Sequence, residues 1–267
     1  MTDHTPAVAD ISLRHLSVGY RDGRHAVRTV LTDIDVQERG GQFVCLMGRN
    51  GSGKSTLLRT LAALQPPLAG TASIAGHDTA LLTPRDRARL VAVVLTRQPD
   101  VTDMTAREMV ATGRTPYTGF WGSLSEADDK AVDEALTMTG TLPLAHRPFA
   151  RLSDGERQKV MVAKALAQQT PVILLDEPAA YLDFTAKVDL MRLLLGLAHK
   201  AGKTIIASTH DFGTAVQLAD RLWIAGDGRL AIGTPRSMAA DGTLARFVEG
   251  DGVVFDAETL AVQVSRE

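Results

Sequence analysis

The sequence contains a glycine-rich segment, Gly48-Arg49-Asn50-Gly51-Ser52-Gly53-Lys54-Ser55-Thr56. The apolar run 43–47 precedes it and the helical run 57–64 follows it, so the order is strand, glycine-rich loop and helix. Glycines let successive main-chain N–H groups point inward at phosphate oxygens, and the helix N-terminus adds the positive end of its dipole. Because the pattern and its context agree, the stretch predicts a phosphate-binding loop rather than an accidental glycine-rich turn.

Two side chains of this loop carry specific predictions. Lys54 is expected to reach the β- and γ-phosphates of a nucleoside triphosphate as a point charge, and the Ser55 hydroxyl is expected to ligate Mg²⁺. The other residues of 48–56 surround the phosphates with main-chain donors. The predicted ligands are therefore ATP and Mg²⁺.

A second apolar run, 172–175, ends abruptly in two acids, Asp176 and Glu177. Parallel sheets place their ligand sites at the carboxyl ends of their strands, so both acids should emerge beside the glycine-rich loop. We expect Asp176 to hold Mg²⁺ through water, and Glu177 to polarise the attacking water as a general base. Two acids at a strand end are by themselves more often a solvated turn, and it is the phosphate-binding loop that favours catalysis.

Short β-branched runs alternate with segments of helical period along most of the chain, which is typical of α/β domains with a parallel sheet. The predicted strands are 11–20, 43–47, 72–74, 91–95, 172–175, 204–207 and 222–225. Between residues 101 and 169 the strand signals vanish, and capping-box spacings at Thr105, Ser125 and Ser153 predict helix starts instead.

These patterns predict an α/β core with a mostly parallel sheet and an inserted helical subdomain. We expect a single domain over 1–267. Its core is 1–98 and 170–238, its helical subdomain is 99–169, and its C-terminal extension is 239–267. The extension contains a candidate hairpin at 252–264.

The composition excludes several classes of protein. The chain is 45% hydrophobic and 22% charged with a formal net charge of -2, which is globular and has no basic excess for nucleic acid. A lone cysteine, Cys45, rules out a disulfide framework within one chain and indicates a buried core thiol. Because no apolar run approaches the roughly 18 residues needed to span a bilayer, we expect a soluble chain.

A third motif connects the chain to a family. The order Leu152-Ser153-Asp154-Gly155-Glu156-Arg157-Gln158 resembles the signature motif of ATP-binding-cassette (ABC) ATPases. Two further segments match in order: 180–183 resembles the D-loop, which ends at Asp183, and 208–211 resembles the switch loop, which contains His210. Tyr20 is similar to the aromatic residue on which the adenine stacks. The resemblance covers about residues 11–248, and it implies a P-loop NTPase (RecA-like) core with an antiparallel β portion near the N-terminus.

For this family the resemblance implies a head-to-tail dimer of two copies, with ATP between one copy's phosphate-binding loop and the other's signature residues Ser153, Asp154, Gly155 and Glu156. It also implies that His210 contacts the γ-phosphate. Free N–H groups at the start of the helix after Ser153 suit a phosphate, and one chain cannot aim that helix at its own loop.

Two departures from the family pattern affect these predictions. Asp154 and Glu156 stand where glycine and glutamine are usual, and like charges disfavour a phosphate unless both acids point away; a capping box gives Glu156 a reason to do so. The glutamine expected after the strand at 91–95 is displaced. Arg97 fits the position and Gln98 fits the residue type, and Gln98 is the predicted nucleotide and Mg²⁺ contact.

Residues 104–117 resemble the corresponding segment of importers for iron-siderophores, heme or vitamin B12. That resemblance implies two ATPase copies at the cytoplasmic face of the membrane, transmembrane permease subunits with a coupling helix that docks on this region, and an external substrate-binding protein. Ordinary core packing of Met104, Met109 and Val110 is the alternative. A soluble ABC ATPase of iron-sulfur assembly or translation, and a nucleotide-dependent module with weak hydrolysis, also stay open.

Overall fold

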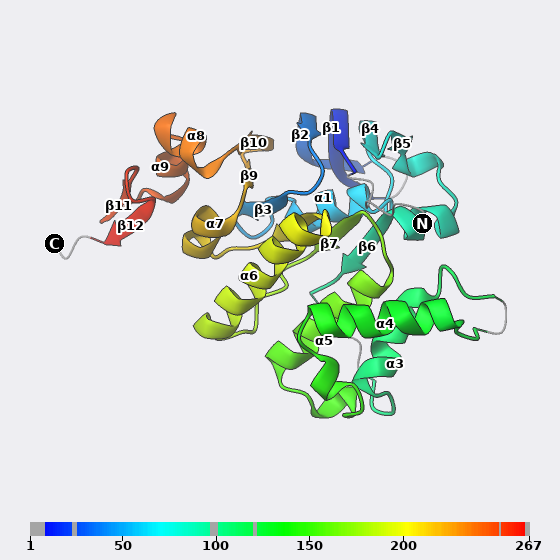
Figure 1. The fold of residues 1–267 in the computed structure, drawn as a ribbon. Helices are drawn as coiled ribbons and strands as arrows, with labels where there is room; N and C mark the ends of the chain where they lie inside the picture. The colour runs from blue at the N-terminus through cyan, green and yellow to red at the C-terminus, as the bar shows by residue number, and fades with distance from the viewer. Residues whose placement is uncertain (1–8, 23–25, 97–100, 120–121, 251, 265–267) are drawn as a thin grey trace.

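The computed structural model describes residues 9–22, 26–96, 101–119, 122–250 and 252–264 of the 267-residue chain. Its centre is a six-stranded sheet of order β10-β9-β3-β8-β7-β6 (Figure 1). All neighbours pair in parallel except β10, which pairs antiparallel with β9 at the edge. In sequence order the strands are β3 (Phe43–Gly48), β6 (Val91–Val94), β7 (Val172–Leu175), β8 (Thr204–Ser208), β9 (Arg221–Gly226) and β10 (Arg229–Gly233).

The inner strands of this sheet are buried on both faces. Along β3, Phe43, Cys45 and Met47 pack into one hydrophobic cluster, whereas Val44 and Leu46 pack into the other. Successive side chains of a strand point to opposite faces, so a continuous apolar run is what a sheet covered on both sides requires. Cys45 is the buried thiol that the sequence predicted, and burial raises its pKa.

A second, antiparallel sheet covers one face together with helix α1 (Lys54–Leu61) (Figure 1). Its order is β2-β1-β4-β5, with bounds β1 (Ile11–Asp22), β2 (Ala26–Glu38), β4 (Ala69–Ile74) and β5 (His77–Asp78). The fold class predicted from the sequence, with its antiparallel portion, is confirmed. The individual strands β2, β5 and β10 were not predicted.

The missing prediction of β2 has a physical reason. Its buried residues Leu31, Ile34 and Val36 are spaced by three and then two, because the pairing with β1 shifts register between Leu16 and Val18. Asp33 adopts a positive φ of 50° at this irregularity. Such an interruption breaks the period-two pattern by which a strand is recognised.

The other face of the central sheet is covered by helices. These include α6 (Phe184–Ala201) and α7 (Phe212–Leu218), while α3 (Ala106–Ala111), α4 (Glu126–Met138) and α5 (Asp154–Ala167) form a separate helical body joined to it (Figure 1). Capping boxes at Thr105, Ser125 and Ser153 begin the last three helices, as the sequence predicted. The remaining helical elements are η1 (Thr79–Leu81), α2 (Pro84–Leu90), η2 (Thr112–Arg114), η3 (Leu142–Leu144), η4 (Phe149–Arg151), α8 (Pro235–Ala240) and α9 (Thr243–Val248).

The chain ends in the predicted hairpin, formed by β11 (Val253–Asp256) and β12 (Ala261–Val264). Across the described ranges, no helix combines the length and the apolar character that a bilayer crossing requires.

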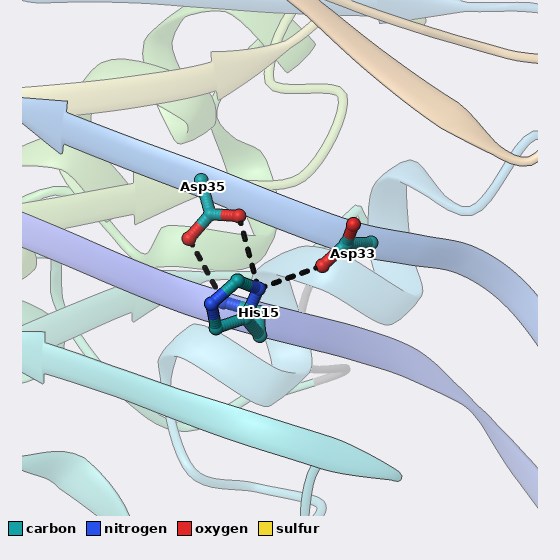
Figure 2. A group of neighbouring side chains, drawn as sticks. All are labelled: His15, Asp33 and Asp35. Carbon is teal, nitrogen blue, oxygen red and sulfur yellow. Dashed lines mark hydrogen bonds and ion pairs between the residues drawn. The ribbon is translucent and has the colours of Figure 1, made fainter.

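An ion-pair cluster marks the irregularity between β1 and β2 (Figure 2). The Nδ1 atom of His15 lies 2.9 Å from Asp33 Oδ1 and 3.3 Å from Asp35 Oδ2. His15 itself has a φ of 46°, and its main-chain N–H donates to Asp35. The hydrogen bond with Asp33 and the charge of Asp35 raise the pKa of this exposed imidazole.

We predict that NMR titration will place the His15 midpoint above 6.5, its ordinary value, and that Asp33→Asn will lower it. The His15 pKa is raised in the folded chain, so its ion pairs stabilise the fold fully at pH values below the pKa of His15 in the unfolded chain. This stabilisation is lost as the pH rises through the pKa of the folded chain. Glu258→Gln, on the distant hairpin, is the control and should leave the midpoint unchanged. An unshifted midpoint in Asp33→Asn would contradict the assignment.

Candidate phosphate-binding site

The glycine-rich loop connects β3 to α1 with a backbone that needs its glycines. Gly48, Gly51 and Gly53 have φ values of 152°, 80° and 102°. A Cβ atom on Gly53 would lie 2.6 Å from Val30 Cγ1, and one on Gly48 would lie 2.5 Å from the Ala225 carbonyl oxygen. At Gly51 the same position opens on free space. The loop is therefore packed tightly against its neighbours at both ends and open in its middle.

Lys54 is the first residue of α1 and is only 5% exposed. Its Nζ donates to the carbonyl oxygens of Gly48 at 2.8 Å and Arg49 at 3.3 Å. The same atom lies 4.0 Å from Glu177 Oε1. A buried ammonium needs partners, and here main-chain carbonyls of its own loop hold it at the cavity.

Asp176 reaches the loop from the carboxyl end of β7, as the sequence predicted. Its Oδ1 accepts hydrogen bonds from Ser55 Oγ at 3.0 Å and from Ser208 Oγ at 2.9 Å. Strand β8, which ends at Ser208, lies between β3 and β7 in the sheet. Neighbouring strand ends therefore bring the hydroxyl and the carboxylate that were predicted to hold Mg²⁺ to one point.

Glu177 follows Asp176 in a strained conformation, with a φ of 49°. Its main-chain N–H donates to Ser208 Oγ at 2.8 Å, and its side chain lines the same cavity as Lys54. A positive φ in a non-glycine residue costs of order 1 kcal/mol or more and persists only where the surroundings hold it, which is common at functional sites. Ser208 therefore contacts both residues: its hydroxyl donates to the carboxylate of Asp176 and accepts from the main-chain N–H of Glu177.

The cavity beside the loop has a volume of about 400 Å³. Its lining combines residues within 50–56 with side chains from β1, β2 and the segment after β7: Tyr20, Arg28, Val30, Asn50, Gly51, Gly53, Lys54, Ser55, Thr56 and Glu177. Tyr20 is 44% exposed and its hydroxyl lies 2.6 Å from Thr56 Oγ1, so its ring stands at the cavity mouth. The buried Ser52 Oγ has no hydrogen-bond partner within the described part of the chain, which fits a loop built for a polyanion.

The signature segment lies elsewhere on the molecule. Ser153 caps α5. The Glu156 carboxylate accepts from the Ser153 N–H at 2.8 Å, and Arg147 Nη1 donates to the same carboxylate at 3.2 Å. Glu156 is thus turned back onto the cap, and this main-chain hydrogen bond is the main cause of its lowered pKa. Asp154 is not turned away in this manner, since it lines a separate cavity of about 520 Å³ that Glu177 also borders.

The other predicted residues are placed as follows. His210 follows β8 and borders a small concavity together with Glu177 and Ser208. Asp183 accepts from the Ala186 N–H and caps α6. Arg97 and Gln98 lie outside the described residues, so the choice between them stays a prediction.

Sequence reasoning missed several residues at this site. Ser208 was quoted within a motif but given no role, and Thr96 Oγ1 donates to the Asp176 carbonyl at 2.9 Å. Arg28 and Val30 line the cavity from β2, the strand that was not predicted. A buried hydroxyl at the end of a strand was the one available signal for Ser208.

The helical region gives a different result. Met109 is 2% exposed and Val110 is fully buried, so core packing, the alternative considered for these residues, describes them. Tyr117 is half-buried and donates its hydroxyl to the Gln168 carbonyl at 3.0 Å. The docking of a permease coupling helix on this region stays a prediction.

One cluster elsewhere offers metal-ligand atoms. Those of His15, Asp33 and Asp35 lie within 4.8 Å of one another on the antiparallel sheet, and all three residues are exposed. Both carboxylates are already paired with the imidazole, so ion pairing accounts for the arrangement.

Several known proteins resemble this chain. A family model described as ABC transporter matches residues 31–180. The chain is 39% identical over 213 residues to the achromobactin transport ATP-binding protein of Dickeya dadantii, covering 79% of this chain and 77% of that protein. It is 36% identical over 262 residues to the hemin import ATP-binding protein of Nocardia farcinica, covering 97% and 90%. A dimeric structure of a bacterial ABC transporter cassette matches with a TM-score of 0.72 at 29% identity, covering 84% of this chain and 98% of that one.

Gly53→Ala should destabilise the protein by about 1–2 kcal/mol or more, because the new Cβ meets Val30 in a left-handed backbone conformation. The matched control is Gly196→Ala within α6, where a Cβ meets open space. That change should stabilise the protein by about 0.5–1 kcal/mol, the helix preference of alanine over glycine. Urea unfolding measures both. Equal effects of the two substitutions would contradict the packing described for the loop.

Proposed function

The chain belongs to the ABC transporter family, and we propose that it binds Mg-ATP and hydrolyses it to drive a membrane importer. The observation that carries the proposal is the convergence of Lys54, Asp176 and Glu177. Two segments far apart in the sequence meet there: Asp176 Oδ1 lies 3.0 Å from Ser55 Oγ of the loop, and Glu177 Oε1 lies 4.0 Å from Lys54 Nζ.

The phosphates bind in the open middle of the loop. Main-chain N–H groups of 51–56 and the N-terminus of α1 donate to their oxygens, and Lys54 exchanges its carbonyl partners for the β- and γ-phosphates. Tyr20 stacks on the adenine at the cavity mouth. Ser55 and Asp176 would hold Mg²⁺, which would neutralise negative charge on the phosphates.

Hydrolysis then needs a water placed in line with the γ-phosphorus. Glu177 orients this water and draws off its proton as the water oxygen bonds to phosphorus and the bond to the bridging oxygen breaks, giving ADP and phosphate. Ser208 fixes the main chain of Glu177, and His210 contacts the γ-phosphate from the neighbouring strand end. Glu177 borders both the cavity at the loop and the small concavity that Ser208 and His210 line, which supports these roles.

A second copy of the chain completes the site in the proposal. The N-terminus of α5 offers N–H groups that suit a γ-phosphate, yet no residue of 153–156 is among those that line the cavity at the chain's own loop. A head-to-tail dimer brings Ser153, Gly155 and the rest of this segment to the partner's nucleotide. Glu156, turned back onto the cap, does not oppose the phosphate.

The transported molecule and the remaining partners are also proposed. Relatives named for achromobactin and hemin transport favour an iron-chelate or heme-type substrate, with cobalamin as a third candidate. The chain would act at the cytoplasmic face of the membrane, bound to transmembrane permease subunits that receive substrate from an external binding protein, without nucleic acid. We also propose that the chain forms a single domain, as inferred from the sequence.

Lys54→Ala should reduce ATP affinity by at least about tenfold, because the phosphates lose their main side-chain charge. Binding of a fluorescent ATP analogue measures the effect. Lys200→Ala, an exposed lysine in the last turn of α6, should leave affinity unchanged. Unaltered affinity in Lys54→Ala would refute the phosphate site.

Glu177→Gln should retain ATP binding and lose about 10²-fold or more in kcat, since the amide cannot accept the proton of the attacking water. Phosphate release measures turnover, and Glu134→Gln on the exposed face of α4 is the control. Equal turnover in Glu177→Gln and the unmodified protein would remove Glu177 from the mechanism and favour weak, uncatalysed hydrolysis.

A further inference from the structure

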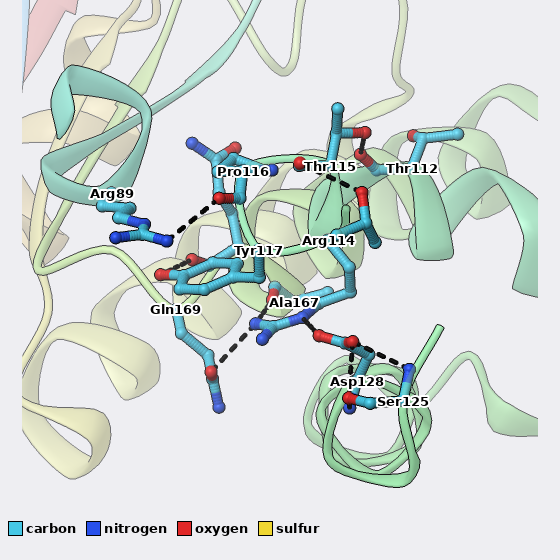
Figure 3. A network of polar contacts seen from close by, with 12 residues as sticks. Arg89, Thr112, Arg114, Thr115, Pro116, Tyr117, Ser125, Asp128, Ala167 and Gln169 are labelled. Carbon is cyan, nitrogen blue, oxygen red and sulfur yellow. Dashed lines mark hydrogen bonds and ion pairs between the residues drawn. The ribbon is translucent and has the colours of Figure 1, made fainter. Parts of the chain in front are cut away.

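The C-terminal end of α5 is held by side chains from another part of the helical body (Figure 3). Arg114 Nη1 donates to the Ala167 carbonyl at 2.6 Å, and the Tyr117 hydroxyl donates to the Gln168 carbonyl at 3.0 Å. The last carbonyls of a helix lack partners within it, and a cation beside them is favoured by the helix dipole. We call Arg114, Tyr117 and Asp128 the C-terminal clamp.

The two charged residues of the clamp are buried and paired with each other, and Tyr117 is half-buried. Arg114 is 4% exposed, and its Nε donates to Asp128 Oδ1 at 2.8 Å. Its guanidinium lies over the Tyr117 ring, 4.0 Å from the ring centroid. Asp128 also caps α4: hydrogen bonds from Ser125, and then Arg114, lower its pKa to about 2. One guanidinium thus connects the start of α4 with the end of α5.

The same clamp is tied to the core. Arg85 Nε donates to the Pro116 carbonyl at 3.0 Å, and Arg89 of α2 lies 5.2 Å from the centroid of the Tyr117 ring. Gln168 Nε2 donates to the Val91 carbonyl at 3.1 Å, at the start of β6. The end of α5 is therefore fixed both to the helical body and to the core.

The turn η2, which contains Gly113, also packs closely against α5. A Cβ atom on Gly113 would lie 2.3 Å from the Lys164 carbonyl oxygen, so this position in η2 needs glycine. The turn that carries Arg114 and Tyr117 consequently has little freedom to slide along the helix.

The geometry points to Arg114 and Tyr117 as positioning residues for the signature segment: by fixing the C-terminal end of α5 to the core, they aim its N-terminal end at the partner's nucleotide. Helix α5 has 14 residues and is about 21 Å long. A tilt of about 3° at the clamp displaces the N-terminal end by about 1 Å, and a misplacement of that size can cost about 10²-fold in rate. This inference rests on the proposed function.

The test compares two clamp variants with a control in the same turn. Tyr117→Phe removes the hydroxyl that reaches α5 and keeps the ring, while Arg114→Lys keeps the charge and loses the fork that joins Asp128 to Ala167. The control, Thr115→Val, removes an exposed hydroxyl that donates to Thr112 within its own turn. Each is measured for affinity toward a fluorescent ATP analogue, for kcat and KM of ATP hydrolysis, and, in a Glu177→Gln background, for ATP-dependent dimerisation by sedimentation.

For Tyr117→Phe we expect kcat and dimer affinity to fall about fivefold, the factor that one lost hydrogen bond produces, with nucleotide affinity of the monomer unchanged within about twofold. Arg114→Lys should show a larger loss of kcat and dimer affinity, again with nucleotide affinity of the monomer unchanged. Thr115→Val should show no change in any of these quantities. The inference would be overturned if both clamp variants fold and keep unaltered kcat and dimer affinity. A parallel loss of nucleotide affinity would overturn it as well. Normal ATP binding in Lys54→Ala would instead refute the proposed function itself.

Discussion

The site depends on the order of three strands. Because β3, β8 and β7 are neighbours in a parallel sheet, their carboxyl ends meet at one edge, and each contributes a group: the glycine-rich loop, Ser208 and Asp176. The Ser208 hydroxyl donates to the Asp176 carboxylate and accepts from the Glu177 N–H, so one buried side chain orients both acids. A strand order that placed β7 further from β3 would separate the acids from the loop.

Charge balance at this edge suits an exchange of partners. Lys54 is buried, and its partners in the structure are two main-chain carbonyls and, at 4.0 Å, one carboxylate. Burying an ammonium without partners is costly, so the loop supplies neutral acceptors that hold the cation in place. Phosphate oxygens make stronger, charge-assisted hydrogen bonds than carbonyls do, and a polyanion can therefore displace them without moving the lysine far.

Whether a feature could be predicted from the sequence depends on how few consecutive residues carry its signal. The loop and the acids after 172–175 are each written in fewer than ten consecutive residues, and one rule about parallel sheets brings them together. Strand β2 has no such local signal, because an irregularity at Asp33 breaks its alternation, and Arg28 and Val30 were missed with it. Met109 and Val110 illustrate a choice that the sequence left open: their burial depends on contacts that only the folded chain reveals.

Helix α5 unites these considerations, because its two ends are stabilised by different means. At the N-terminal end the capping box satisfies its donors locally, and Glu156 is held back by Ser153 and Arg147. At the C-terminal end the carbonyls are satisfied from a distance, by Arg114 and Tyr117. The local cap stabilises the N-terminal end of the helix. The contacts of the C-terminal end with α4 and the core, together with the buried face of the helix, hold its axis in place.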